Sequence, residues 1–219
     1  MSPPSLPAGG TGKDSTFSRI IAGKLPAKWV VNHPTSPVVC FHNRLKWARV
    51  MLLVVPRDYM TQEELWQGDI LQDAMKLAVE VGEKHCPEGF RIISNFGRGA
   101  HQSQLHAHIH VVSDLARNID EAEPIGEWQQ RGRVKIRQHD VQSAPYAELY
   151  RDDTSVSQYE FLTGEGVKLA AEAAISHAKQ SSPTGFRLKA NYTNANRNSE
   201  RGGDPGLFML GGGQLSLYV

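Results

Sequence analysis

The 219-residue chain lacks several features that mark whole classes of protein. Its 24 lysines and arginines nearly balance 23 aspartates and glutamates, and the net charge of +1 gives no electrostatic footprint for nucleic acid or an anionic membrane. No apolar run approaches the ~20 residues of a membrane span, and the N-terminal residues lack a signal-peptide layout. The only two cysteines, Cys40 and Cys86, lie in apolar stretches. We therefore expect buried free thiols and a cytoplasmic protein.

Histidine, by contrast, is concentrated at one place. Three of the nine histidines, His106, His108 and His110, occupy alternate positions and are followed by two valines. Residues 106–112 alternate histidine with small or β-branched residues, which predicts a β-strand. Alternate side chains of a strand share one face, so the three imidazoles would lie together while the residues between them enter a core.

Three imidazoles on one face are compatible with two kinds of chemistry. Neutral imidazole is a common ligand of zinc, copper and iron. It is also a nucleophile, whose neighbours set its tautomer and bind developing charge. The remaining alternative, a chance polar face, explains three alternating histidines poorly. No cysteine pair and no His-Glu motif marks a further metal ligand elsewhere in the chain.

The residues before and after this stretch predict an α+β fold. Short β-rich runs separated by Pro, Asn and Gly surround one long amphipathic segment, which Pro87 and Gly89 end. The expected helices are 17–23, capped by Ser15 or Thr16, and 61–85. The expected strands are 27–31, 38–42, 50–55, 90–95 and 106–112.

The second half contains an echo of the first. The matched segments are 76–80 with 168–172, 87–91 with 183–187, and Asn95 with Asn191. Where a second triad would stand, residues 206–211 contain no histidine. We expect residues 113–144 to connect the halves, with a strand at 134–137. The expected organisation is a disordered leader at 1–14, a domain with the site at 15–116, and a degenerate repeat at 117–219.

The His-x-His-x-His motif followed by two apolar residues resembles the signature of the histidine triad (HIT) family of nucleotidyl hydrolases and transferases. A strand ending in Asn95, a glycine-containing loop and Gln102 precede it, as in family members. Residues 16–28 resemble the family's opening helix and first strand. The resemblance implies an antiparallel sheet with flanking helices. Since family members pair through their sheets, the echo implies an intrachain pseudo-dimer, with a homodimer as the alternative.

The resemblance also implies roles for individual residues. His108 matches the family's nucleophile, which attacks the α-phosphorus of a nucleotide and forms a covalent nucleotidyl-histidine. His110 would bind phosphate oxygens, and His106 would orient the site. The resemblance assigns phosphate binding to Asn95, Gln102 and Ser103, and nucleoside binding to Phe17, Ile21, Phe41, His42 and Asn43. A loop-stabilising role is the alternative for the first set, and a core position for its apolar members is the alternative for the second.

The implied substrate is a small nucleotide with a purine base, either a nucleoside phosphoramidate or a dinucleoside polyphosphate, and no cofactor is implied. Met51 stands near the place where many relatives carry a fourth histidine. This departure, with the degenerate second half, suggests a second hypothesis, a nucleotide-binding or sensing protein without turnover. A metal-binding module is the third.

Overall fold

The structure is a computed structural model, and it describes residues 14–46, 48–113, 123–141, 144–155, 157–193 and 205–212. The expected leader at 1–14 lies outside these residues apart from Asp14, as does the expected boundary between residues 116 and 117. Among the residues described, no helix combines the length and apolarity needed to cross a bilayer.

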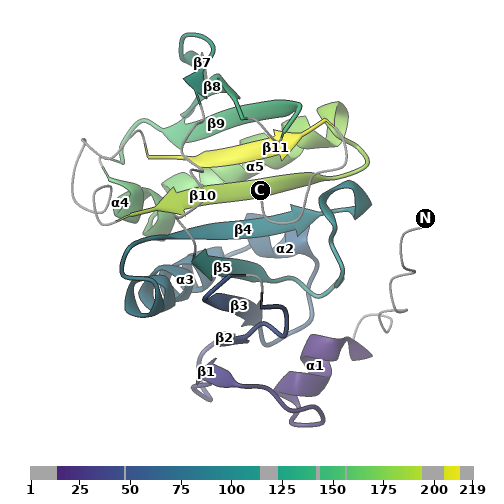
Figure 1. The fold of residues 1–219 in the computed structure, drawn as a ribbon. Coiled ribbons are helices and arrows are strands. Elements are labelled where there is room, and N and C mark those ends of the chain that lie inside the picture. Colours follow the sequence, from purple (N-terminus) through teal and green to yellow (C-terminus); the bar gives the residue numbers. More distant parts are fainter. Residues whose placement is uncertain are drawn as a thin grey trace.

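Within the described residues, eleven strands form one antiparallel sheet (Figure 1). The order is β1-β2-β3-β5-β4-β10-β11-β9-β8-β6, with β7 also paired to β8. The strands are β1 Trp29–Val31, β2 Val38–His42, β3 Met51–Pro56, β4 Phe90–Phe96, β5 Ile109–Ser113, β6 Glu123–Pro124, β7 Gln129–Arg131, β8 Val134–Asp140, β9 Tyr146–Asp152, β10 Phe186–Tyr192 and β11 Leu207–Gly211.

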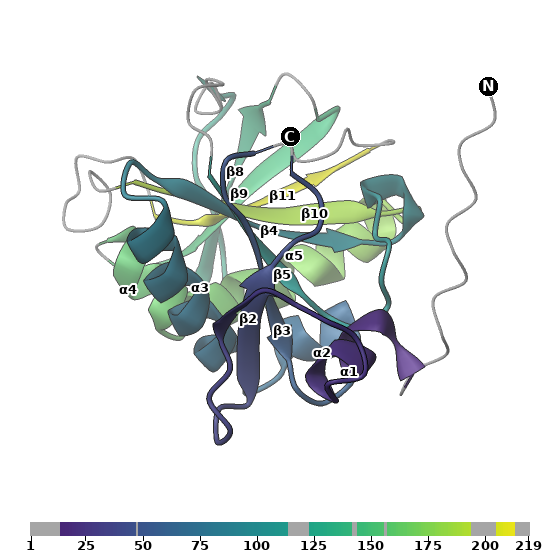
Figure 2. The same ribbon diagram turned by 60° about the horizontal axis from the view of Figure 1, so that its bottom comes forward.

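Four helices, α2 Gln62–Gln67, α3 Leu71–His85, α4 Gln158–Thr163 and α5 Gly166–Ser181, lie on one side of the sheet (Figure 2). They enclose the main core, which includes both free cysteines. Helix α1, Thr16–Ile21, covers the opposite face of β2 and β3 through a separate apolar cluster that contains Phe17 and Ile20. A short 3-10 turn, η2 Arg98–Ala100, follows β4. The expected α+β fold is confirmed.

The single helix expected over 61–85 is wrong, because the segment forms two helices. Thr61 caps α2 in a capping box with Glu64, and the helix ends at Gly68, which is extended (φ −89°, ψ 175°). A Cβ on Gly68 would lie 2.5 Å from the carbonyl oxygen of Glu64. The chain therefore turns where only glycine fits, and α3 begins at Leu71.

The strand expected over 106–112 begins later than expected, at Ile109. The N–H of Ala107 donates to the carbonyl of Met60 at 2.8 Å, and the N–H of His108 donates to the side chain of Gln62 at 2.8 Å. Residues 106–108 thus bond with the segment that starts α2 instead of with a neighbouring strand.

From β2 to β4 the second half repeats the first with a separation of 96 positions, and β11 follows β5 with a separation of 98. Ser157 caps α4 with a second capping box, as Thr61 caps α2. The pair Val134 and Asp152 joins β8 to β9 as Val38 and Pro56 join β2 to β3. The expected connection at 113–144 therefore includes strands of the second unit. The match of 76–80 with 168–172 is one helical turn out of register.

The two units meet where β4 pairs with β10. Ile93 faces Lys189 at the centre of this pairing. On either side lie stacked rings, Phe90 on Tyr192 at 4.8 Å between centroids and Phe96 on Phe186 at 4.4 Å. Because the strand order is mirrored about this pair, the chain is an intrachain pseudo-dimer.

We expect Gly68→Ala to lower the free energy of unfolding by about 1–3 kcal/mol, because the added Cβ must displace the backbone at the end of α2. Gly126→Ala is the control, since nothing lies within 4 Å of a Cβ there. Urea denaturation of both variants measures the difference. Equal stabilities would show that the α2–α3 break does not depend on glycine.

Candidate active site

A cavity of about 930 Å³ lies between α1, the strands β2 and β3, and the histidine stretch. His108 and His110 form part of its wall, together with Ser103. Its apolar side includes Phe17 and Phe41. The residues that the sequence singles out thus border a concave space of the size that binds small molecules.

His108 is held in one tautomer by its own chain. Its Nδ1 lies 2.9 Å from the carbonyl oxygen of His106, which can only accept, so Nδ1 carries the proton. The lone pair is then on Nε2, which has no hydrogen-bond partner among the described residues. Burial lowers the pKa of His108 to about 4. The ring is therefore neutral at physiological pH.

His106 serves as a structural link. Its Nε2 donates to the carbonyl of Pro56 at 2.9 Å, and its Nδ1 accepts from the hydroxyl of Ser15 at 2.9 Å. Ser15 also caps α1 by accepting from the N–H of Ser18. Both ring nitrogens are thus occupied, and the ring joins α1 to the end of β3. Burial is the main cause that lowers the pKa of His106.

His110 follows on the same side of the sheet. Its ring centroid lies 4.9 Å from that of His108 in an edge-on arrangement. Burial lowers the pKa of His110 well below its ordinary value, and the nearby His108 and Arg187 lower it further. The two imidazoles that border the cavity are therefore both neutral and adjacent.

A glutamine holds the backbone of His108 from both sides. The Nε2 of Gln62 donates to the His108 carbonyl at 2.7 Å, while its Oε1 accepts from the His108 N–H. The hydroxyl of Ser94 donates to the same carbonyl at 3.1 Å. Sequence reasoning missed both residues. The capping box places Gln62 at the start of a helix, but its partner lies 46 positions further on.

The three residues assigned to phosphate binding are placed differently. Ser103 lines the cavity. Gln102 holds its own loop, since its side chain accepts from the N–H of Gly97 at 2.8 Å and donates to the carbonyl of Gln104 at 3.0 Å. Asn95 is buried and accepts from Arg187. Gln102 thus makes the contacts of the loop-stabilising alternative, and the three phosphate roles stay predictions.

Four of the five residues assigned to the nucleoside line the cavity, namely Phe17, Phe41, His42 and Asn43. Ile21 does not, because the preceding residue of α1, Ile20, faces the cavity instead. Ile21 packs against the edge of the α1 cluster. Met51 also lines the cavity and packs with Ile93 and Val112.

No group of three or more His, Cys, Asp or Glu side chains among the described residues is arranged to hold a metal ion. The histidine stretch illustrates the reason. The ring nitrogens of His106 point to Ser15 and Pro56, away from the cavity that His108 and His110 border.

The first unit of the chain is similar to known proteins. The model of the HIT domain matches residues 24–116. An uncharacterized 13.2 kDa HIT-like protein of Azospirillum brasilense is 31% identical over 104 residues, which are 45% of this chain and 84% of that protein. The chain belongs to the HIT family.

Two solved structures match beyond the HIT domain. A galT-like protein from Arabidopsis thaliana has a TM-score of 0.52 at 10% identity and covers 87% of this chain and 80% of its own. A DUF4931 family protein from Bacillus cereus has a TM-score of 0.53 at 8% identity and covers 87% of both chains. These likenesses show that the two-unit fold occurs in other proteins.

The second unit places a buried arginine beside Asn95 and His110. Arg187 on β10 is the strand partner of Asn95, and its Nε donates to Asn95 Oδ1 at 2.7 Å. The guanidinium is fully buried and acts electrostatically on His110. The sequence matches the segment with Arg187 to the segment with Arg91. It contains no signal that the Arg187 side chain bonds to Asn95 in the other unit.

We expect the ring of His108 to titrate near pH 4 in the folded protein. Because the unfolded chain takes up this proton nearer 6.5, the His108 contribution to stability is complete above 6.5 and is lost as the pH falls towards 4. Histidine ring resonances, assigned by comparison with His108→Gln, measure the midpoint by NMR. A midpoint near 6.5 would contradict the burial of this ring.

Replacement of Arg187 should change the pKa of His110. Arg187→Met is expected to raise the pKa of His110, because it removes a nearby positive charge. Arg187→Lys is the control, since it keeps the charge but not the forked donors that reach Asn95. The His110 titration by NMR in the three proteins distinguishes the cases. An unchanged midpoint in Arg187→Met would show that the two groups are not coupled.

Proposed function

We propose that the chain is a metal-independent nucleotide hydrolase or nucleotidyl transferase that acts at the α-phosphate through a covalent nucleotidyl-histidine on His108. The observation that carries the proposal is the state of this ring. Its Nδ1 is protonated and bonded to the His106 carbonyl, so that a neutral Nε2 is available beside the cavity. A neutral, oriented imidazole is a competent nucleophile.

The reaction consists of two displacements. In the first, the Nε2 lone pair forms a bond to the α-phosphorus as the bond from phosphorus to the leaving oxygen or nitrogen breaks. The positive charge that develops on the ring is stabilised by the Nδ1–H bond to the His106 carbonyl. In the second, water or another acceptor attacks the α-phosphorus and the P–N bond breaks, which regenerates His108. Two inversions give overall retention at phosphorus.

The neighbours of His108 have supporting roles in this proposal. His110 binds the phosphate oxygens, and Ser103 donates to them from the loop. His106 positions the nucleophile through its carbonyl and through its link to Ser15. Gln62 holds the His108 backbone, so the ring needs no reorganisation when substrate enters.

The rest of the cavity favours an extended anionic substrate. The apolar side chains of Phe17, Ile20 and Phe41 suit a purine base. Four basic residues also line the cavity, namely Lys28, Arg44, Lys46 and Arg49. A phosphoramidate monoester carries too little charge to engage them all. We therefore favour a dinucleoside polyphosphate over a nucleoside phosphoramidate, and a cytoplasmic site of action, in keeping with the two free thiols.

The decisive experiment measures AMP release from diadenosine polyphosphate and from adenosine phosphoramidate, with and without chelator. We expect chelator-resistant turnover that His108→Ala reduces at least about 10³-fold, since it removes the nucleophile. His33→Ala, an exposed histidine outside the cavity, should leave turnover unchanged. Rapid quenching and mass spectrometry should find AMP attached to His108.

Two other outcomes would decide for the rival functions. AMP binding without turnover of either substrate, unchanged in His108→Ala, would favour a nucleotide sensor. Turnover that chelator abolishes would contradict the metal-independent mechanism and favour a metal-binding module.

A further inference from the structure

A second cavity, of about 300 Å³, lies in the other unit on the helix-covered side of the sheet. Glu148 of β9 and Ile136 of β8, both buried, form its floor. Tyr146 of β9 and His177 of α5 are partly buried and form its walls. Gln129, Arg131 and Gln138 are exposed at its rim. None of these residues belongs to the triad site.

At the equivalent place in the first unit, buried apolar side chains occupy the positions of this cluster. With the separation of 96 positions, the matched pairs are Leu52 with Glu148, Val54 with Tyr150, and Val81 with His177. The three apolar members belong to the main core and are at most 2% exposed. A buried carboxylate in place of leucine costs folding free energy unless it is bonded. The second unit thus has an ionisable cluster at positions where packing alone would favour apolar side chains.

Two side chains of the cluster contact the same oxygen of the carboxylate. Oε2 of Glu148 accepts from the hydroxyl of Tyr150 and lies 2.9 Å from Nδ1 of His177. The Tyr146 hydroxyl lies 3.4 Å from the same nitrogen. Burial is the largest cause that raises the pKa of both tyrosines, and the nearby Glu148 carboxylate raises it further, so they remain donors. Both of the contacts to Glu148 with a defined oxygen use Oε2, and the carboxylate itself lines the cavity as an acceptor.

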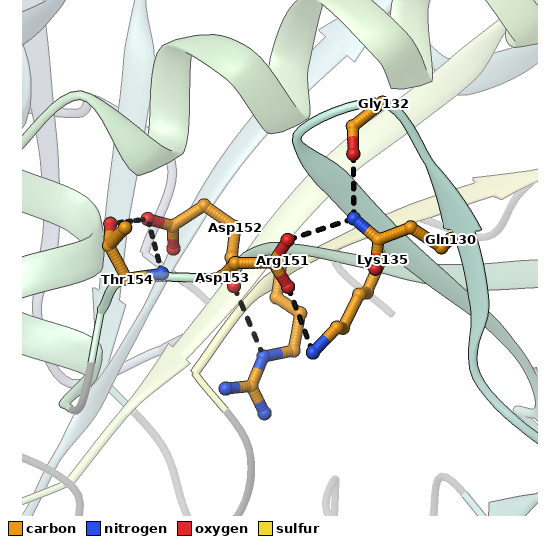
Figure 3. Close-up of polar contacts among 7 residues, drawn as sticks. All are labelled: Gln130, Gly132, Lys135, Arg151, Asp152, Asp153 and Thr154. Atoms are coloured by element: carbon orange, nitrogen blue, oxygen red, sulfur yellow. Dashed lines mark hydrogen bonds and ion pairs between the residues drawn. The ribbon is translucent and has the colours of Figure 1, made fainter.

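The rim of the cavity carries the positive charge of Arg131. In the part of the chain that the structure describes, the side chain of Arg131 has no hydrogen bond or ion pair, and it is not paired with Glu148. The β7–β8 hairpin that carries it is anchored, because Gln130 donates to Asp153 at 2.8 Å and Lys135 pairs with Asp153 at 2.8 Å (Figure 3). The cavity therefore has a buried negative end and a positive rim.

We propose that this cavity binds a small zwitterion of the amino-acid class, with its ammonium on Glu148 and its carboxylate on Arg131. An ammonium group has three donors for the acceptors at the floor, and a guanidinium binds a carboxylate through two parallel bonds. A simple anion would face the Glu148 carboxylate. A neutral polyol would leave both charges unmatched. The amides of Gln129 and Gln138 supply further hydrogen bonds at the rim.

Isothermal titration calorimetry with the full chain tests the proposal. The probes are glycine, β-alanine, γ-aminobutyrate and a set of larger α-amino acids, which vary the distance between the charges. Ethylamine and propionate carry one charge each, and glucose represents a neutral polyol. We expect at least one zwitterion to bind about tenfold or more tightly than either singly charged probe, since it alone makes both charge-assisted contacts.

Single substitutions show which residues bind the zwitterion. Arg131→Gln, at the exposed rim, should weaken the binding of the zwitterion about ten- to a hundredfold. Arg133→Gln, two positions along the same hairpin but paired with Glu165, should not. Glu148→Gln should abolish binding that the exposed Glu172→Gln retains. Nucleotide turnover should stay unchanged in all four variants, and zwitterion binding should persist in His108→Ala.

The proposal is overturned if no zwitterion binds, if glucose or a singly charged probe binds as tightly, or if Arg131→Gln binds the zwitterion as the wild type does. Because Arg131 is exposed, that last result does not depend on whether Glu148→Gln folds. These outcomes are independent of the triad chemistry, which is read from AMP release.

Discussion

The antiparallel pairing of β4 with β10 is the contact on which the rest of the molecule depends. It joins two α+β units into one sheet and lays the stacked ring pairs Phe90–Tyr192 and Phe96–Phe186 on either side of the centre. In the HIT unit alone, β4 would be an edge strand, and its unpaired N–H and C=O groups could pair with strands of other molecules. In this chain the second unit covers that edge. The pairing also brings Arg187 against Asn95, so the unit without a triad supplies a buried cation to the unit that has one.

The two units show how one framework carries different chemistry. Their capping boxes, glycine stops and strand registers coincide, because these features determine how the helices lie on the sheet. The side chains that fill the space between the sheet and the helices differ between the two units. Leu52 in one unit corresponds to Glu148 in the other, so one unit has a packed core where the other has a polar cavity. The first unit places its cavity on the opposite face of the sheet, under α1.

The sequence was sufficient for features that depend on near neighbours. The alternation of the triad, the α+β order, the strand at Val38–His42 and the end of α3 at His85 all follow from local patterns. Features that depend on distant atoms were missed. The α2 break at Gly68 reflects contact with a backbone oxygen, and the late start of β5 reflects bonds to residues 60–62. The misregistered match at 76–80 arose because a helix resembles itself one turn further on.

Residues with long-range partners were equally hidden. In the sequence, Gln62 is an ordinary residue at a helix start and Arg187 an ordinary strand residue. Only the fold brings them into contact with His108 and Asn95. Ile21 was assigned to the cavity in place of Ile20 because the sequence does not fix the rotation of a six-residue helix. Burial of the whole site, which keeps His108 neutral, is likewise a property of the assembled layers.

The second unit separates what the histidine site needs for folding from what it needs for chemistry. Gln158 holds Gly206 with the same two bonds, at 3.0 and 2.7 Å, that Gln62 makes to His108. The glutamine clamp is therefore a structural device that joins a helix start to a strand start, with or without an imidazole. A Cβ on Gly206 would lie 2.6 Å from a side-chain carbon of Leu149 and 2.8 Å from the Tyr150 carbonyl oxygen. A histidine cannot be restored there unless β9 moves. The second unit thus keeps the glutamine clamp of the first and leaves no room at Gly206 for an imidazole.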